Sequence, residues 1–244
     1  MERYETPKTR RLPVRKFSQA ELEMWRETIF DIYRRMRQRD TPYEAACGDI
    51  VLTALPNVYA PFFFTDSQWF GEHVSSIVGT GSLLEIGSGS GVISVICALN
   101  GARVTATDIN PAAVENTRIN AEKYKLDIDV RSGDLYSPLR ESEKFEYIFW
   151  AHPFNNWETP VDDILLRSGM DFRYEGIRGY IAGAKAHLRP DGRLLLGTGD
   201  SADLETIEKI AIESGYTLKL LREATMPLEL GLPNEITYLI YELG

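Results

Sequence analysis

The chain has 244 residues, of which 43% are hydrophobic, and a formal net charge of −9. This length and apolar content suit one large α/β domain. No apolar run approaches the roughly 20 residues that cross a bilayer, so we expect a cytoplasmic protein without a membrane partner. The acidic balance makes nucleic acid a less favoured partner, because it repels a phosphate backbone.

The first predicted element is a helix that follows a basic N-terminal arm. Residues 1–40 carry 11 Lys and Arg against 7 Asp and Glu, in contrast to the acidic remainder. Ser18 and Glu21 have the spacing of a capping box, and the apolar residues that follow at helical intervals predict a helix to about residue 39. We interpret the arm as a solvated flexible segment, with a local contact to RNA as the alternative.

The stretch DIVLTALPNVYAP predicts an extended segment with proline stops after this helix. Thr65 and Gln68 then have the spacing of a second helix cap, with apolar residues behind them at helical intervals. We therefore divide the chain into a basic arm with a helical extension, residues 1–64, and a ligand-binding domain, residues 65–244.

Short apolar strands alternate with helical patterns from residue 82 onward. Such alternation predicts a parallel sheet that is covered by helices on both faces. The last two strands follow each other without a helix, so we expect them to pair antiparallel at one edge. The predicted strands are SLLEI, RVTAT, DIDVR, YIFWA, RLLLG, YTLKLL and ITYLIYEL.

A glycine-rich loop, EIGSGSG, follows the first of these strands. Ligands bind beyond the carboxyl ends of the central strands in such sheets, so the loop has the position of a cofactor site, with bare backbone at three alternating glycines. Gly87, Gly89 and Gly91 have the spacing G-x-G-x-G, and Val92 stands where the dinucleotide fingerprint has its last glycine. Glu85 would repel a pyrophosphate but can hold a cation, directly or through water.

Two further carboxylates reach the same edge of the predicted sheet. Asp108 ends the next strand, 21 residues after Gly87, where a carboxylate can accept both hydroxyls of a ribose. Asp134 ends the strand after that and can accept an exocyclic amino proton of an adenine lying between Ile109 and Leu135. The predicted ligand has an adenine, a ribose and a positive centre, and it needs no phosphates.

With EIGSGSG, ATDINPAAVENTRINA and SGDLYSPL on three successive strands, the chain resembles the class I S-adenosylmethionine-dependent methyltransferases over about residues 55–244. The resemblance implies an α/β, Rossmann-like fold with a seven-stranded, mostly parallel sheet, an antiparallel edge strand and an N-terminal helical extension. It implies S-adenosyl-L-methionine as the cofactor, in preference to a nicotinamide dinucleotide. The residues expected to bind the cofactor are Glu85, Gly87, Ser88, Gly89, Gly91, Asp108, Ile109, Asp134, Leu135 and Ala151, with Thr65 as a partner for the methionine carboxylate.

These motifs are most similar to those of the release-factor glutamine and ribosomal RNA amino-group methyltransferases, which carry N-P-P-Y after the fourth strand. There the asparagine accepts protons of the target nitrogen and the aromatic residue packs on the acceptor. Here the stretch is AHPFNN, with Ala151 at the asparagine position. His152 is predicted as a general base or, equally, as a packed loop histidine. Phe154 either stacks on the acceptor or belongs to the core, and Asn155 and Asn156 are substitute proton acceptors.

The segment NNWETPVDDILLRSGMDFRYEG is long for a loop, which predicts a lid or binding element. The lid candidates are Trp157, Asp162, Asp163, Asp171 and Tyr174, which together favour a cationic or amine-bearing acceptor. No metal site is expected, because Cys47 and Cys97 have no metal-ligand spacing. We predict methyl transfer to a nitrogen or oxygen of a small molecule or a protein side chain. The alternatives are amino-group methylation of RNA and an inactive cofactor-binding scaffold.

Overall fold

The computed structural model describes residues 18–229 and 234–244, so the basic arm predicted before the first helix lies outside the described residues. The helices are α1 (Gln19–Arg37), α2 (Asp66–Val78), α3 (Val92–Leu99), α4 (Pro111–Lys123), α5 (Glu175–Ala184) and α6 (Leu204–Glu213), with a 3-10 turn, η1 (Leu166–Ser168). The strands are β1 (Tyr43–Cys47), β2 (Ile50–Ala54), β3 (Ser82–Ile86), β4 (Arg103–Asp108), β5 (Ile128–Ser132), β6 (Phe145–Ala151), β7 (Asn155–Trp157), β8 (Met170–Phe172), β9 (Leu188–Gly199), β10 (Leu218–Pro227) and β11 (Glu235–Leu243).

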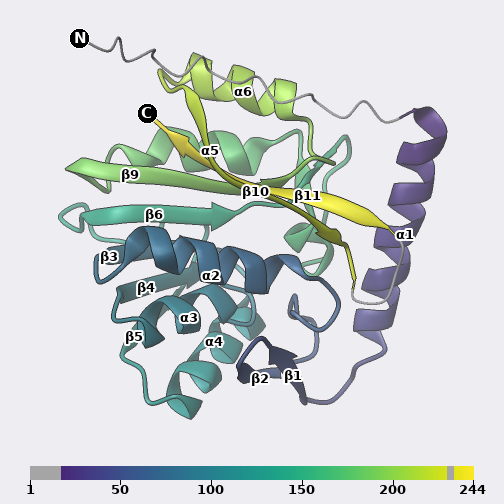
Figure 1. The fold of residues 1–244 in the computed structure, drawn as a ribbon, viewed down its shortest axis with the longest axis horizontal. Coiled ribbons are helices and arrows are strands. Elements are labelled where there is room, and N and C mark those ends of the chain that lie inside the picture. Colours follow the sequence, from purple (N-terminus) through teal and green to yellow (C-terminus); the bar gives the residue numbers. More distant parts are fainter. Residues whose placement is uncertain (1–17, 230–233) are drawn as a thin grey trace, which may run out of the picture.

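A seven-stranded sheet in the order β10-β11-β9-β6-β3-β4-β5 forms the centre of the fold (Figure 1). The five strands from β9 to β5 are parallel to one another. β11 runs antiparallel to both β9 and β10 and lies between them. The predicted α/β, Rossmann-like fold and its antiparallel edge are thereby confirmed.

Apolar residues at successive positions of the strands pack alternately into two separate cores, one on each face of the sheet. Leu83 packs in a cluster that contains Phe70 of α2, whereas its neighbour Leu84 packs in a cluster that contains Ile177 of α5. This follows from the strand repeat, in which successive side chains point to opposite faces. Because both faces are covered at the centre of the sheet, the central strand β3 is buried at every position.

The order of the strands also decides where a ligand can bind. The chain runs outward from β3 through β4 to β5 and then returns to β6 on the other side of β3. The carboxyl ends of β3, β4 and β6 therefore border a crevice at the point where the strand order reverses.

The two predicted helix caps have different outcomes. At α1 the capping box is confirmed, because the Glu21 amide donates to Ser18 Oγ and the Glu21 side chain accepts from the Ser18 amide. α2 begins where expected, but Thr65 does not cap it. Its hydroxyl instead donates to the carbonyl oxygen of Pro227 at 2.6 Å, a partner far away in the sequence. The predicted Thr65 cap was therefore wrong.

The extended segment predicted after α1 is the second strand of a hairpin, β1–β2, whose first strand was not predicted. Two buried asparagines of α4 hold β2 through its backbone. The Asn120 side chain pairs with both the amide and the carbonyl of Thr53, at 2.8 Å each. Asn116 accepts from the Leu55 amide at 2.8 Å. The domain boundary at residue 64 stays a prediction.

The long segment between β6 and α5 has regular structure of its own. β7 and β8 pair parallel as a small separate sheet, and η1 lies between them in the sequence. The segment is thus an ordered insertion at the carboxyl edge of the main sheet. No helix in the described parts of the chain is both long and apolar enough to cross a membrane.

Candidate functional site

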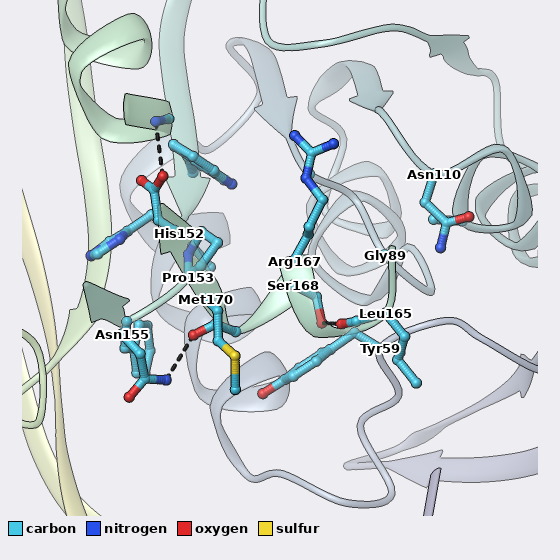
Figure 2. A pocket seen from close by; sticks show the side chains of 18 of the residues that line it. Tyr59, Gly89, Asn110, His152, Pro153, Asn155, Leu165, Arg167, Ser168 and Met170 are labelled. Carbon is cyan, nitrogen blue, oxygen red and sulfur yellow. Dashed lines mark hydrogen bonds between the residues drawn. The ribbon is translucent and has the colours of Figure 1, made fainter. Parts of the chain in front are cut away.

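A cavity of about 600 Å³ opens at the carboxyl ends of β3, β4 and β6. Most residues predicted for the site line it, and Figure 2 shows part of this lining. They are Glu85, Gly87, Ser88, Gly89, Asp108, Ile109, Asp134, Leu135, Ala151, His152, Phe154 and Asn155. Thr65, Gly91 and Asn156 are not among the lining residues. The described residues contain no group of three or more His, Cys, Asp or Glu side chains that could hold a metal ion.

The three glycines of the loop have left-handed backbones, with φ of 67° at Gly87, 56° at Gly89 and 83° at Gly91. A Cβ atom on Gly87 would lie 2.8 Å from the Trp150 indole nitrogen, and one on Gly91 would lie 3.0 Å from a methyl carbon of Thr117. A Cβ atom on Gly89 would meet nothing closer than 3.6 Å. Of the three, only Gly89 combines a place in the cavity lining with free space at its α-carbon. At Gly87 and Gly91 the neighbouring Trp150 and Thr117 leave no room for a side chain.

Glu85 lies at the end of β3 beneath this loop and is only 1% exposed. The Ser94 hydroxyl donates a hydrogen bond to its Oε2 atom. Burial raises the pKa of Glu85 to about 8, an effect that the Ser94 bond opposes and the nearby Asp108 carboxylate increases. A cation beside Glu85 would stabilise its charged form and offset the cost of burial.

Asp108 ends β4 and binds the backbone of the glycine loop. Its Oδ2 accepts from the Gly89 amide at 2.9 Å, and its Oδ1 accepts from the Asn110 amide at 2.8 Å. Burial raises the pKa of Asp108, while these amides favour the charged form. Each carboxylate oxygen has a further lone pair, so the group can still accept hydroxyls from a ligand.

The predicted adenine position lies on the next strand ends. Ile109 is 36% exposed, and both Ile109 and Leu135 line the cavity, as does the exposed Asp134. The Leu135 backbone is left-handed, with φ of 47°, and its carbonyl accepts from the Thr107 hydroxyl at 3.3 Å. Two apolar side chains and one carboxylate are thus available to a flat, amino-bearing ring.

His152 follows the last residue of β6, Ala151, and its side chain is buried in the protein. It is 2% exposed, lies near the rings of Trp150 and Tyr174, and its Nε2 is 2.8 Å from Thr198 Oγ1. Burial lowers the pKa of His152 to about 3. A base this weak accepts few protons at neutral pH, which favours the packed-histidine interpretation.

The residues after His152 divide between cavity and scaffold. Phe154 packs edge-on against Phe70, with ring centroids 6.5 Å apart, and also lines the cavity. The Asn155 side chain donates to the Gly169 carbonyl at 2.7 Å, which ties β7 to the start of β8 (Figure 2). Asn156 Oδ1 is buried and has no hydrogen-bond partner among the described residues. Asn155 is thus occupied in holding the insertion.

A polar group at the start of α2 was not predicted from the sequence. The Tyr59 hydroxyl donates to Asp66 Oδ2 at 2.9 Å, the Ser67 hydroxyl lies 3.1 Å from Asp66 Oδ1, and all three residues line the cavity. Burial raises the pKa of Asp66 to about 6. The sequence did contain a signal for this group: Asp66 is the one acid in the aromatic stretch VYAPFFFTDSQWF. A carboxylate in such an apolar stretch is rarely buried without a partner.

Comparison with known proteins gives a consistent family assignment. Residues 51–214 match the family model described as "Methyltransferase small domain". A bifunctional methyltransferase of Rickettsia conorii is 28% identical over 57% of this chain, and a release factor glutamine methyltransferase of Aquifex aeolicus is 30% identical over 47% of it. The chain spans 28% and 45% of the length of these two relatives.

Among solved structures, a 16S rRNA N2 methyltransferase of T. thermophilus, in complex with AdoMet and guanosine, is similar over 82% of this chain and 50% of its own. The TM-score is 0.60 and the sequence identity is 21%. A likeness at this identity shows that the two chains share a fold.

Proposed function

The chain belongs to the methyltransferase small domain family, and on that premise we propose that it transfers a methyl group from S-adenosyl-L-methionine to a nitrogen or oxygen atom of a small molecule or a protein side chain. The observation that carries the proposal is the convergence of Glu85, Gly89, Asp108 and Asp134 on one cavity. Carboxylates and bare backbone without a lysine in the described lining suit a nucleoside with a positive centre better than a dinucleotide.

The residues present fit such a cofactor, which when bound supplies a methyl group on a positively charged sulfur. Asp108 would accept the ribose hydroxyls while it keeps its bond from the Gly89 amide. Ile109 and Leu135 would hold the adenine between them, within reach of Asp134. These roles use the three strand ends that the topology brings together.

The two ends of the methionine part need different partners. Glu85 is the buried acid that can compensate a positive centre. Thr65 is a poor partner for the carboxylate, because its hydroxyl donates to Pro227. At the start of α2 the Ser67 hydroxyl and nearby amides already bind the Asp66 carboxylate, so this group is better suited to accept from the amino group of the methionine part than to bind its carboxylate.

Methyl transfer from sulfur is an in-line displacement that disperses charge, so orientation of the two reactants is the main task of the protein. Orientation can contribute roughly 7–11 kcal/mol. Phe154 and the backbone oxygen of Ala151 border the cavity where an acceptor atom would approach. His152, with a pKa of about 3, is better suited to fix the end of β6 through Thr198 than to remove a proton.

Amino-group methylation of RNA is the second candidate, favoured by the rRNA methyltransferase among the similar structures. The described cavity lining disfavours it, since Asp108, the exposed Asp134 and other acids of the lining repel a phosphate backbone. The third candidate, a scaffold that binds cofactor without turnover, is motivated by alanine at position 151.

The three candidates are separated by one experiment. The protein is incubated with methyl-labelled S-adenosyl-L-methionine and, in turn, small-molecule, protein and RNA fractions, and the label is located by mass spectrometry. We expect labelled product in the small-molecule or protein fraction and none in RNA. Binding of S-adenosylhomocysteine without label in any fraction would support the scaffold, and absence of such binding would contradict the proposed function itself.

A further inference from the structure

The part of the cavity beyond the cofactor residues has apolar walls. Trp25, Ile29 and Tyr33 of α1 contribute to one wall, and Val161 and Leu165 of the insertion between β6 and α5 contribute to another. In Figure 1, α1 lies alongside the edge of the sheet toward which β6 points. Ile29 and Tyr33 are only 7% and 2% exposed. Apolar walls of this kind bind an apolar ligand body.

Contacts between α1 and the insertion hold these walls together. The hydroxyls of Tyr33 and Ser168 are 3.0 Å apart, and the rings of Phe30 and Trp157 meet edge to face with centroids 5.8 Å apart. These contacts join α1 to the insertion, so residues of both elements bound the apolar part of the cavity. A cavity of about 600 Å³ has the size of a small-molecule site.

The acids of the insertion are used to hold the fold. Asp163 forms an ion pair with Arg37 and accepts from the Leu165 amide at 3.0 Å. Asp171 accepts from the Gly176 amide at 2.9 Å. Asp163 does not line the cavity and therefore gives no support to the predicted cationic or amine-bearing acceptor, whereas Asp171 lines the cavity and keeps lone pairs for a ligand.

Arg167 is the only Lys or Arg among the described residues that line the cavity. Its guanidinium forms no hydrogen bond or ion pair with another described residue, and its charge acts on the Asp171 carboxyl, whose pKa it lowers. Figure 2 shows its side chain extending from η1, with Pro153 on one side of its base in this view and Gly89 of the glycine loop on the other. A guanidinium binds a planar anion with two parallel hydrogen bonds, which fits carboxylate and phosphate groups.

Building on the proposed function, we propose that the methyl acceptor is a small molecule with an apolar body and an anionic group, a carboxylate or a phosphate, that Arg167 binds. The apolar body lies between α1 and the insertion, and the anionic group fixes its orientation. Arg167 then determines specificity, because an analogue that lacks the anion leaves the guanidinium without a partner.

The test uses the full chain saturated with S-adenosylhomocysteine and three probes of one shape: 2-naphthoate, 2-naphthamide and 2-naphthyl phosphate. Their dissociation constants are measured by calorimetry for the wild type, Arg167→Gln and a matched control, Arg173→Gln. Arg173 belongs to the same insertion but pairs with Glu158 at 3.8 Å, is largely exposed and does not line the cavity. The affinity of each variant for S-adenosylhomocysteine is measured separately.

We expect an anionic probe to bind the wild type and Arg173→Gln at least about tenfold more tightly than the amide, and this preference to be lost in Arg167→Gln. The naphthoate and phosphate arms identify which anion is preferred. Equal binding of amide and anions by the wild type would overturn the inference. So would weaker S-adenosylhomocysteine binding by Arg167→Gln, since Arg167 would then bind the cofactor. Failure of the wild type to bind S-adenosylhomocysteine would instead contradict the proposed function.

Discussion

Gly87 and Gly89 share a left-handed backbone but have different neighbours, which leads to distinct expectations for alanine at each position. Gly87→Ala should destabilise the protein by more than the roughly 1–2 kcal/mol of backbone strain, because the new methyl group meets Trp150. Gly89→Ala should cost only the strain but should weaken cofactor binding. Urea denaturation and calorimetry with S-adenosylhomocysteine measure the two effects. Equal destabilisation by the two variants would contradict the assigned contacts.

Asp108 is the side chain on which the ribose assignment depends. Asp108→Ala should weaken S-adenosylhomocysteine binding by roughly 1–3 kcal/mol, because buried ribose hydroxyls lose a charged acceptor. It should also lower stability, since the Gly89 and Asn110 amides lose their partner. Asp127→Ala, at an exposed position outside this cavity, is the control. If calorimetry finds that Asp108→Ala binds S-adenosylhomocysteine with wild-type affinity, Asp108 does not bind the ribose.

Among the elements, α4 holds the β1–β2 hairpin in place through hydrogen bonds between its side chains and the backbone around β2. Asn120 bonds to the backbone of Thr53 and to the Ser90 carbonyl, and it is fully buried. Asn120→Ala should lower the free energy of unfolding by about 2–4 kcal/mol, because several buried polar groups lose their partners. Glu115→Ala, on the exposed side of the same helix, should change it little. Chemical denaturation of both variants checks this, and similar midpoints would refute it.

The insertion between β6 and α5 shows how elements build the site together. β7 and β8 pair with each other rather than with the main sheet, and Asn155 ties them at Gly169. The insertion is then held to α1 by Tyr33 and Ser168. The apolar part of the cavity consequently lies between two elements that are far apart in the sequence, and neither of them forms it alone.

At the scale of the whole molecule, Glu85 and His152 make stability depend on pH in opposite directions. The folded-state pKa of Glu85 is about 8, above its usual value of about 4.3, so stability falls as pH rises between these values. The folded-state pKa of His152 is about 3, below its usual value of about 6.5, so stability falls as pH is lowered through that range.

Above about pH 6.5, His152 is mostly neutral in both states and the Asp66 carboxyl, with a folded-state pKa of about 6, is mostly charged, so the Glu85 effect dominates. The free energy of unfolding without cofactor should therefore fall by up to about 1.4 kcal/mol per pH unit between about pH 6.5 and 8. Glu85→Gln should flatten this slope while it weakens binding of S-adenosyl-L-methionine, whose positive charge Glu85 would compensate. Denaturation at several pH values in this window is the measurement. The same slope in both proteins would show that Glu85 is not the group responsible.

The sequence by itself determined the sheet, its covering helices and the edge at which the ligand residues meet. Strand and helix periods are local properties, and parallel strands necessarily bring their carboxyl ends to one edge, so Glu85, Asp108 and Asp134 could be placed together before any contact was known. The capping box at Ser18 is likewise local, since both partners lie within one helical turn.

Only the tertiary structure decided what those residues touch. The Thr65 hydroxyl donates to Pro227 instead of capping α2, and the buried His152 ring contacts Thr198. Asp163 forms an ion pair with Arg37. Each of these partners lies far away in the sequence, and competition among partners is settled by packing and desolvation rather than by spacing. For the same reason, no sequence pattern singled out Arg167. The folded chain shows that it lines the cavity without a hydrogen bond or ion pair to another described residue.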